Sequence, residues 1–83
     1  RPCVILSPPE MNERLRTIIG APMTTGSRPA PSRIPSHFQG QAGFILLEQI
    51  RALDKRRLSR RLGNISADAL TLALATLREI FEE

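Results

Sequence analysis

The sequence predicts an α+β fold, a small and strongly bent antiparallel sheet or barrel with one C-terminal helix packed against it. Short β-branched segments, separated by prolines and glycines, fill most of the chain, and one amphipathic segment with helical spacing follows them. At 83 residues the chain can form one domain with a small core. A second subunit would therefore add stability.

The first part of the chain predicts two strands. Residues 2–7 form a short apolar run that stops at two prolines, which is typical of a strand followed by a turn. Residues 9–16 are polar apart from one strong anchor, Leu15, and fit either one helical turn or a loop, of which we predict the loop. Residues 17–25 carry β-branched side chains and predict the second strand, in which Pro22 implies an edge or a bulge.

Prolines and glycines dominate residues 26–43, where we expect a loop with a short strand over residues 33–38. Residues 43–54 begin with an apolar run and then alternate, which predicts one strand that crosses the core. Residues 55–63 place two leucines among five basic residues and fit either one helical turn or a surface strand.

The end of the chain predicts a helix over residues 67–82. The Ser66 hydroxyl can cap it, and Asp68 in the first turn favours the positive end of the helix dipole. Ile65 and Leu70 have the spacing of a hydrophobic staple. The residues expected to face the sheet are Leu70, Ala73, Leu74, Leu77, Ile80 and Phe81.

Charge divides the chain into a basic body and an acidic end. Residues 1–63 hold eleven basic and four acidic side chains, whereas residues 64–83 hold one basic and four acidic. The body therefore favours a polyanion or an acidic peptide as partner. Residues 51–61 carry half of the basic side chains, and without interleaved aromatic residues they fit a solvated face or an acidic-peptide contact somewhat better than nucleic-acid binding. With phenylalanine as the only aromatic residue, base stacking on tyrosine or tryptophan is excluded.

The sequence gives little support for a metal site, a cofactor site or a membrane-spanning segment. One histidine, His37, and one cysteine, Cys3, provide no paired ligand spacing, so we expect no metal and no cofactor. A phosphate loop of the G-x-x-x-x-G-K-[ST] kind is absent from the sequence. No apolar run is long enough to cross a bilayer, and we expect no membrane association. The single cysteine favours a reducing cytoplasm.

Arginine and hydroxyl groups remain as candidates for chemistry. Arg1 precedes the first strand, and a guanidinium can hold phosphate oxygens through two parallel hydrogen bonds. Thr24 and Thr25 end the second strand, where a hydroxyl can point at a bound oxyanion. These groups could line one end of the sheet, but a strand-end Thr-Thr pair and a terminal arginine are also common without any function.

Three blocks of the sequence, RPCVILSP, APMTTGSR and GFILLEQIRALDKRRLSRRLG, together resemble the MazF/PemK family of toxin endoribonucleases. Their order and spacing match, over nearly the whole chain. The resemblance implies a small SH3-like barrel with a C-terminal helix, a homodimer, and metal-independent cleavage of single-stranded RNA. It also implies a MazE/PemI-like antitoxin partner, whose acidic flexible tail occupies the RNA groove.

The same resemblance implies roles for individual residues. Arg1 is similar to the catalytic arginine that stabilises the pentacovalent phosphate, and Thr24 to the catalytic threonine that hydrogen-bonds the scissile phosphate. Glu48 stands where some members use a carboxylate base. The residues implied to contact RNA are Thr25, Ser27, Arg28, Gln49 and Arg51.

Two other functions stay open. Family members carry a strand ahead of the first block, and this sequence starts at Arg1, so we expect one domain over residues 1–83 without that strand. Such a domain could be a non-catalytic module that dimerises or binds RNA or antitoxin. A gyrase inhibitor of the related CcdB fold is the third option.

Overall fold

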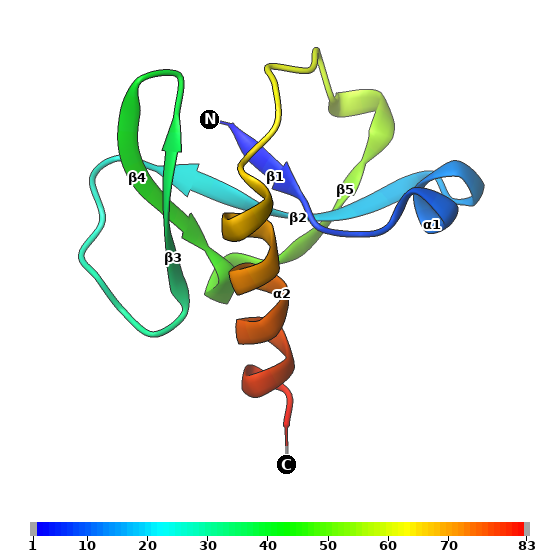
Figure 1. Cartoon of the computed structure of the whole chain (residues 1–83). Helices are drawn as coiled ribbons and strands as arrows, with labels where there is room; N and C mark the ends of the chain where they lie inside the picture. The colour runs from blue at the N-terminus through cyan, green and yellow to red at the C-terminus, as the bar shows by residue number, and fades with distance from the viewer. Residues whose placement is uncertain (1, 83) are drawn as a thin grey trace.

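The computed structural model describes residues 2–82 and confirms the predicted α+β class. Five strands form one curled antiparallel sheet, and the C-terminal helix lies against it (Figure 1). The elements in chain order are β1 (Cys3–Ile5), α1 (Pro9–Arg14), β2 (Thr17–Thr24), β3 (Arg33–Phe38), β4 (Gln41–Leu46), the 3₁₀ turn η1 (Leu47–Gln49), β5 (Arg51–Asp54), the 3₁₀ turn η2 (Lys55–Arg57) and α2 (Ala67–Ile80).

β2 is the central strand, and the sheet curls around it. One edge pairs with β1, while the other pairs first with β5 over residues 17–20 and then with β4 over residues 23–24. Pro22 falls between these two partners, at a point where the second edge has no ladder partner to receive an N–H. The edge or bulge predicted at Pro22 is thus a change of partner strand on one side of β2.

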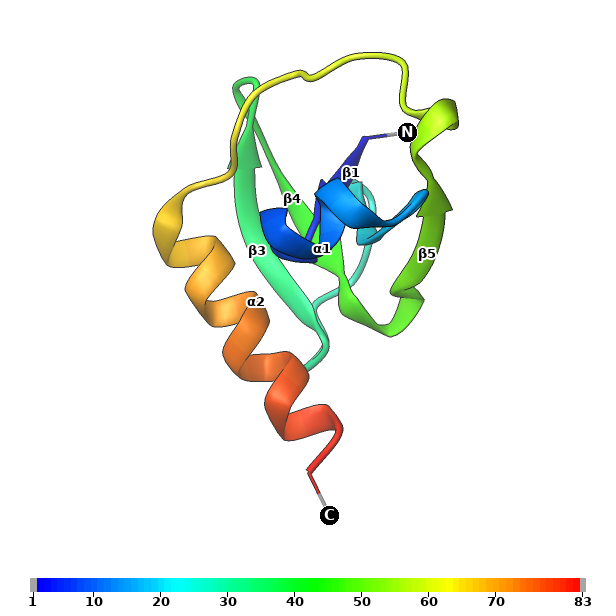
Figure 2. The same ribbon diagram turned by 90° about the vertical axis from the view of Figure 1, so that its right-hand side faces the viewer.

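The core lies between the sheet and α2. It gathers apolar side chains from β1, β2, β3, β4, η1 and α2, namely Val4, Ala21, Ile34, Ile45, Leu47 and Ala73. Ala73 is completely buried, and its small side chain lets the helix backbone approach the strands closely. Figure 2 shows α2 running alongside β3, with the segment after β5 arching over the molecule to reach it.

The predicted helix is confirmed over Ala67–Ile80, with the Ser66 hydroxyl accepting a hydrogen bond from the Ala69 N–H at 3.1 Å. Ile80 and Phe81 were predicted to face the sheet, and this was wrong, because they are 46 % and 72 % exposed. The sheet does not extend that far along the helix, which projects beyond it towards the C-terminus in Figure 1.

Two predictions between the first strand and the helix were wrong. Residues 9–14 form a helix and not a loop, because Pro9 starts it without losing a hydrogen bond and Lys55 donates to the carbonyl oxygens of Asn12 and Leu15 at its end. Residues 43–54 are not one strand, since η1 divides them into β4 and β5, which pair with the same edge of β2.

The predicted strand over residues 33–38 is confirmed as β3, and it turns directly into β4 through a two-residue hairpin. Gln39 and Gly40 both have positive φ angles, as a type I′ turn requires. The helical turn considered for residues 55–63 is present only over Lys55–Arg57.

Candidate functional site

A cavity of about 300 Å³ lies at the end of β2 that carries Thr24. It is bounded by the ends of β2, β3 and β4 and by residue 2, and its walls include Pro2, Thr24, Thr25, Ser36, Phe38 and Gly43. Thr24 is half-buried, and its Oγ1 accepts a hydrogen bond from the Gly26 N–H at 3.3 Å. Thr25 is exposed. Both threonines singled out from the sequence therefore face one hollow, which we call the Thr24 groove.

Gly43 sets the width of the Thr24 groove. A Cβ at this position would lie 2.2 Å from the Thr24 carbonyl oxygen, so β4 can approach β2 this closely only with glycine there. The type I′ turn at Gln39 and Gly40 closes the hairpin that forms the opposite wall. The Thr24 hydroxyl is thus held on a rigid strand pair.

Arg1 lies outside the described residues, so its predicted role is not tested by the structure. Its covalent neighbour, Pro2, lines the Thr24 groove, and the Pro2 carbonyl oxygen accepts a hydrogen bond from the Met23 N–H at 2.9 Å. The chain therefore enters the sheet beside the groove.

Glu48 lies in η1 and is engaged by two residues that precede or begin β3. Ser32 Oγ donates to Glu48 Oε1 at 2.8 Å, and Arg33 donates through Nε and Nη2 to Oε2 at 3.2 and 3.1 Å. Partial burial raises the pKa of Glu48 somewhat, but the hydrogen bonds from Ser32, its own backbone and Arg33 outweigh it and lower that pKa below its usual value. Glu48 is thus ionised at neutral pH, and it does not line the Thr24 groove.

The other predicted RNA-contacting residues lie in two places outside the groove wall. Ser27 and Arg28 belong to the loop that leaves Thr24, and the Arg28 carbonyl oxygen accepts from Arg33 Nη1 at 2.9 Å. Gln49 ends η1 and Arg51 begins β5, and both side chains are exposed. The structure therefore joins Arg28 to Glu48 through Arg33, and it separates this group from the threonines.

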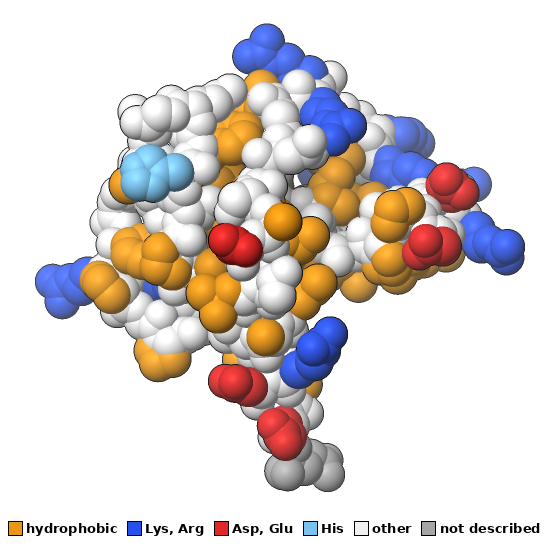
Figure 3. Space-filling model, viewed as in Figure 1, with side chains coloured by type: hydrophobic (Ala, Val, Ile, Leu, Met, Phe, Trp, Pro, Cys, Tyr) orange, Lys and Arg blue, Asp and Glu red, His pale blue; other side chains and the backbone are white. Residues whose placement is uncertain are grey.

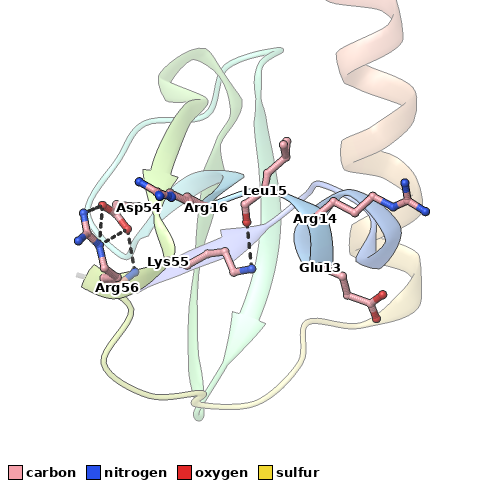
Figure 4. Close-up of a pocket in the computed structure, with 7 residues that line it drawn as sticks. All are labelled: Glu13, Arg14, Leu15, Arg16, Asp54, Lys55 and Arg56. Carbon is pink, nitrogen blue, oxygen red and sulfur yellow. Dashed lines mark hydrogen bonds and ion pairs between the residues drawn. The ribbon is translucent and has the colours of Figure 1, made fainter.

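A second cavity, of about 520 Å³, lies where β2 begins and β5 ends (Figure 4). We call it the Lys55 cavity; its walls are Glu13, Arg14, Leu15, Arg16, Asp54, Lys55 and Arg56. Two of its cations already have partners. Lys55 is hydrogen-bonded to the carbonyl oxygens at the end of α1, and Arg56 forms an ion pair with Asp54 at 2.9 Å. Figure 4 shows Glu13 and Arg14 extending away from that pair.

Charge on the surface follows the sequence. Figure 3 shows most lysine and arginine side chains on the α1 and β5 side of the molecule and above it, where acidic side chains also lie, and further acidic side chains near the end of α2. Among residues 2–82, no cluster of three or more histidine, cysteine, aspartate or glutamate side chains is placed to hold a metal ion. None of the described helices is long and apolar enough to span a membrane.

Sequence analysis missed the β3–β4 wall of the Thr24 groove. Ser36 is a buried polar residue that faces the groove, and Phe38 lies beside it. A glycine between two strand-like segments marks a turn, so the position of Gly40 indicated where this wall folds back on itself. Arg33, which joins Arg28 to Glu48, carried no signal of its own.

Comparison with known proteins places this arrangement in a family. Residues 1–81 match the family described as PemK-like, MazF-like toxins of type II toxin-antitoxin systems. The chain belongs to this PemK/MazF-like toxin family. No protein with a curated description matches the chain in sequence.

Solved structures share the PemK/MazF-like fold. MazE–MazF (Form-III) from Deinococcus radiodurans is 27% identical with a TM-score of 0.84, over 96% of this chain and 83% of that one. The Mycobacterium tuberculosis toxin MazF-mt6 is 20% identical with a TM-score of 0.84, over 98% and 85%. An endoribonuclease in complex with its cognate antitoxin, from a mycobacterial species, is 20% identical with a TM-score of 0.85, over 95% and 78%.

Proposed function

We propose that this toxin is a metal-independent endoribonuclease that cuts single-stranded RNA, mRNA in the cell, at short sequences. Family membership over residues 1–81 carries the proposal, and the half-buried Thr24 hydroxyl in a preformed groove supports it. The basic body suits a polyanionic substrate. Such a substrate also implies a cytoplasmic protein.

In the proposed reaction the RNA supplies its own nucleophile. The 2′-oxygen gives its proton to solvent water and bonds to the adjacent phosphorus, the bond from phosphorus to the 5′-oxygen breaks, and that oxygen takes up a proton from water. The products are a 2′,3′-cyclic phosphate and a 5′-hydroxyl. Negative charge grows on the phosphoryl oxygens in between, where donors held in advance are most effective.

Two groups are proposed to act on that charge. Thr24 Oγ1 is fixed at the end of β2 and donates to a phosphoryl oxygen from the groove wall. Arg1 is covalently attached to Pro2, which lines the same groove, and its guanidinium neutralises the pentacovalent phosphate. The resemblance implies a carboxylate base at Glu48, but Glu48 does not line the Thr24 groove, so no step is assigned to it. The proposed contacts to the RNA are Thr25, Ser27, Arg28, Gln49 and Arg51.

The proposed partners are a second copy of the chain and an antitoxin with an acidic tail. Relatives of this fold have been solved as a MazE–MazF pair and as an endoribonuclease with its cognate antitoxin. In this chain Leu72 on α2 is 50 % exposed and Phe81, directly after α2, is 72 % exposed, which leaves apolar area for a partner to cover.

The test is incubation of the purified protein with a mixed pool of single-stranded RNA, with and without EDTA. We expect scission with 2′,3′-cyclic phosphate ends, unaffected by EDTA, and a loss of at least about 100-fold in kcat/KM for Arg1→Ala. A pool with 2′-O-methyl groups should bind and stay whole. RNA that is shifted in a gel but never cut would replace the proposal with a binding module, and trapped gyrase–DNA complexes would replace it with a gyrase inhibitor.

A further inference from the structure

We propose that Arg33 is a positioning residue that ties the loop leaving Thr24 to η1, and that Glu48 serves as the partner of Arg33 and not as a proton acceptor. The inference rests on the proposed ribonuclease function, and it assigns a role to a side chain that the resemblance did not single out. It concerns residues 25–32, here called the β2–β3 loop, which carries Arg28.

The β2–β3 loop has little regular structure to hold it. Between Thr24 and Arg33 the chain carries two prolines and one glycine, and no residue there belongs to a helix or a strand. Three backbone or cap contacts anchor its ends: Gly26 N–H to Thr24 Oγ1, Arg33 N–H to the Ala30 carbonyl, and Leu47 N–H to the Ser32 carbonyl at 3.0 Å.

Arg33 supplies the connection across the middle. Its Nη1 donates to the Arg28 carbonyl oxygen at 2.9 Å, while its Nε and Nη2 both donate to Glu48 Oε2. One planar guanidinium therefore contacts both the loop and η1, and a lysine could not make this pattern with a single ammonium. The two side chains are 26 % and 34 % exposed, so water screens the pair only in part.

The same contacts argue against Glu48 as a general base. Ser32 Oγ occupies Oε1 and Arg33 occupies Oε2, so both oxygens accept hydrogen bonds before any substrate arrives. The shared hydrogen bonds also lower the pKa of Glu48, which weakens it as a proton acceptor at neutral pH. A carboxylate in this setting is suited to hold an arginine in place.

The contacts of Arg33 with Glu48 and with the Arg28 carbonyl, here called the Arg33 tie, lie next to proposed RNA contacts along the chain. Gln49 follows Glu48 directly, and Arg28 lies on the other side of Arg33, so one interaction sets the spacing of two proposed RNA contacts. The β2–β3 loop also begins at Thr25, on the groove wall. Release of the tie should weaken RNA binding and leave the chemistry at Thr24 largely intact.

The experiment compares Arg33→Ala, Glu48→Gln and the charge swap Arg33→Glu with Glu48→Arg, with Arg60→Ala as an exposed-arginine control. The first readout is amide hydrogen exchange, which needs no catalysis. We expect the Leu47 amide to exchange about tenfold faster in Arg33→Ala and less so in Glu48→Gln, while amides within α2 keep their rates. The charge swap should restore part of the protection.

The second readout is function. KM for RNA, and the Kd for a 2′-O-methyl RNA pool, should rise about 5- to 20-fold in both single variants, with kcat changed less than about threefold. A fall of 100-fold or more in kcat for Glu48→Gln alone, with Leu47 exchange unchanged, would identify a base and overturn the inference. If the parent protein cuts no RNA, the ribonuclease proposal fails. Unchanged exchange of the Leu47 amide in Arg33→Ala would show that Arg33 does not hold the β2–β3 loop to η1, whether or not the protein cuts RNA.

Discussion

The two ends of β2 carry hollows of opposite character. The Thr24 groove is the smaller and presents hydroxyl and amide groups, whereas the Lys55 cavity is larger and is walled by four cations and two carboxylates. Judged by its cations alone, the Lys55 cavity would be the expected place for an RNA to bind. Its Lys55 and Arg56 are already engaged by backbone carbonyls and by Asp54, so this charge serves largely to hold α1 and η2.

We expect a hydroxyl whose proton is free to serve a bound phosphate better than cations that already hold backbone carbonyls and a carboxylate. β2 spans roughly 25 Å, so the two hollows cannot contact the same phosphate. The Thr24 hydroxyl accepts one hydrogen bond from Gly26, and its proton is available to a ligand.

The largest effect is expected from removing the hydroxyl of Thr24. Thr24→Ala should lower kcat for RNA cleavage about 10²- to 10³-fold, because one donor to the developing phosphoryl charge is lost. Thr17→Ala is the matched control, since Thr17 is a half-buried threonine at the opposite end of the same strand. Steady-state kinetics and thermal unfolding of both variants check the contrast. Equal losses in the two would remove Thr24 from the mechanism.

A smaller effect is expected from closing the gap between β2 and β4. Gly43→Ala places a Cβ 2.2 Å from the Thr24 carbonyl oxygen, which forces the strands apart and should cost about 2–3 kcal/mol of unfolding free energy. Gly26→Ala is the control, because nothing lies within 4 Å of its Cβ position. Urea unfolding measures both. Wild-type stability in Gly43→Ala would contradict the close strand approach on which the groove depends.

At the other end, Lys55→Met should loosen α1 without disabling the site. It removes the donor to the Asn12 and Leu15 carbonyl oxygens, and because Lys55 is exposed we expect a loss of about 1 kcal/mol. Hydrogen exchange at the Leu15 amide should rise, and kcat should change less than about threefold. The neighbouring Arg57→Ala provides the control. A large loss of kcat in Lys55→Met would indicate that the chemistry takes place at the Lys55 cavity and not at the Thr24 groove.

Local patterns in the sequence were sufficient for α2 and for the end of β2. Ser66, Asp68 and the helical spacing of apolar residues act within a few positions of one another, and Thr24 stands directly before a glycine-containing loop. Such signals can be recognised in any short window of the chain.

The features that were missed depend on contacts between distant residues. η1 interrupts the predicted strand, and its Glu48 is hydrogen-bonded by Ser32 and Arg33, which lie sixteen and fifteen residues earlier. The end of α1 is stabilised by Lys55, which lies forty residues after Leu15. The stretch of residues 43–54 fits one strand as long as its partners are unknown, because an apolar run passes directly into an alternating one. The Thr24 groove likewise forms only when the β3–β4 hairpin meets β2.

The smallest expected effect is a difference in acid sensitivity between two carboxylates. Burial raises the pKa of Glu48, but the hydrogen bonds from Ser32, its own backbone and Arg33 together outweigh burial and lower that pKa, and a hydrogen bond from Arg56 lowers the pKa of Asp54. A lowered folded-state pKa gives stability that is present above the unfolded value and lost as pH falls through the folded one, here below about pH 4.5. Glu48→Gln should therefore flatten the decline of Tm between pH 5 and pH 3 more than Asp54→Asn, since Arg56, the partner of Asp54, is 83 % exposed whereas Arg33, the partner of Glu48, is 26 % exposed. A steeper decline in Glu48→Gln than in the parent would show that the Arg33–Glu48 tie is not formed in solution.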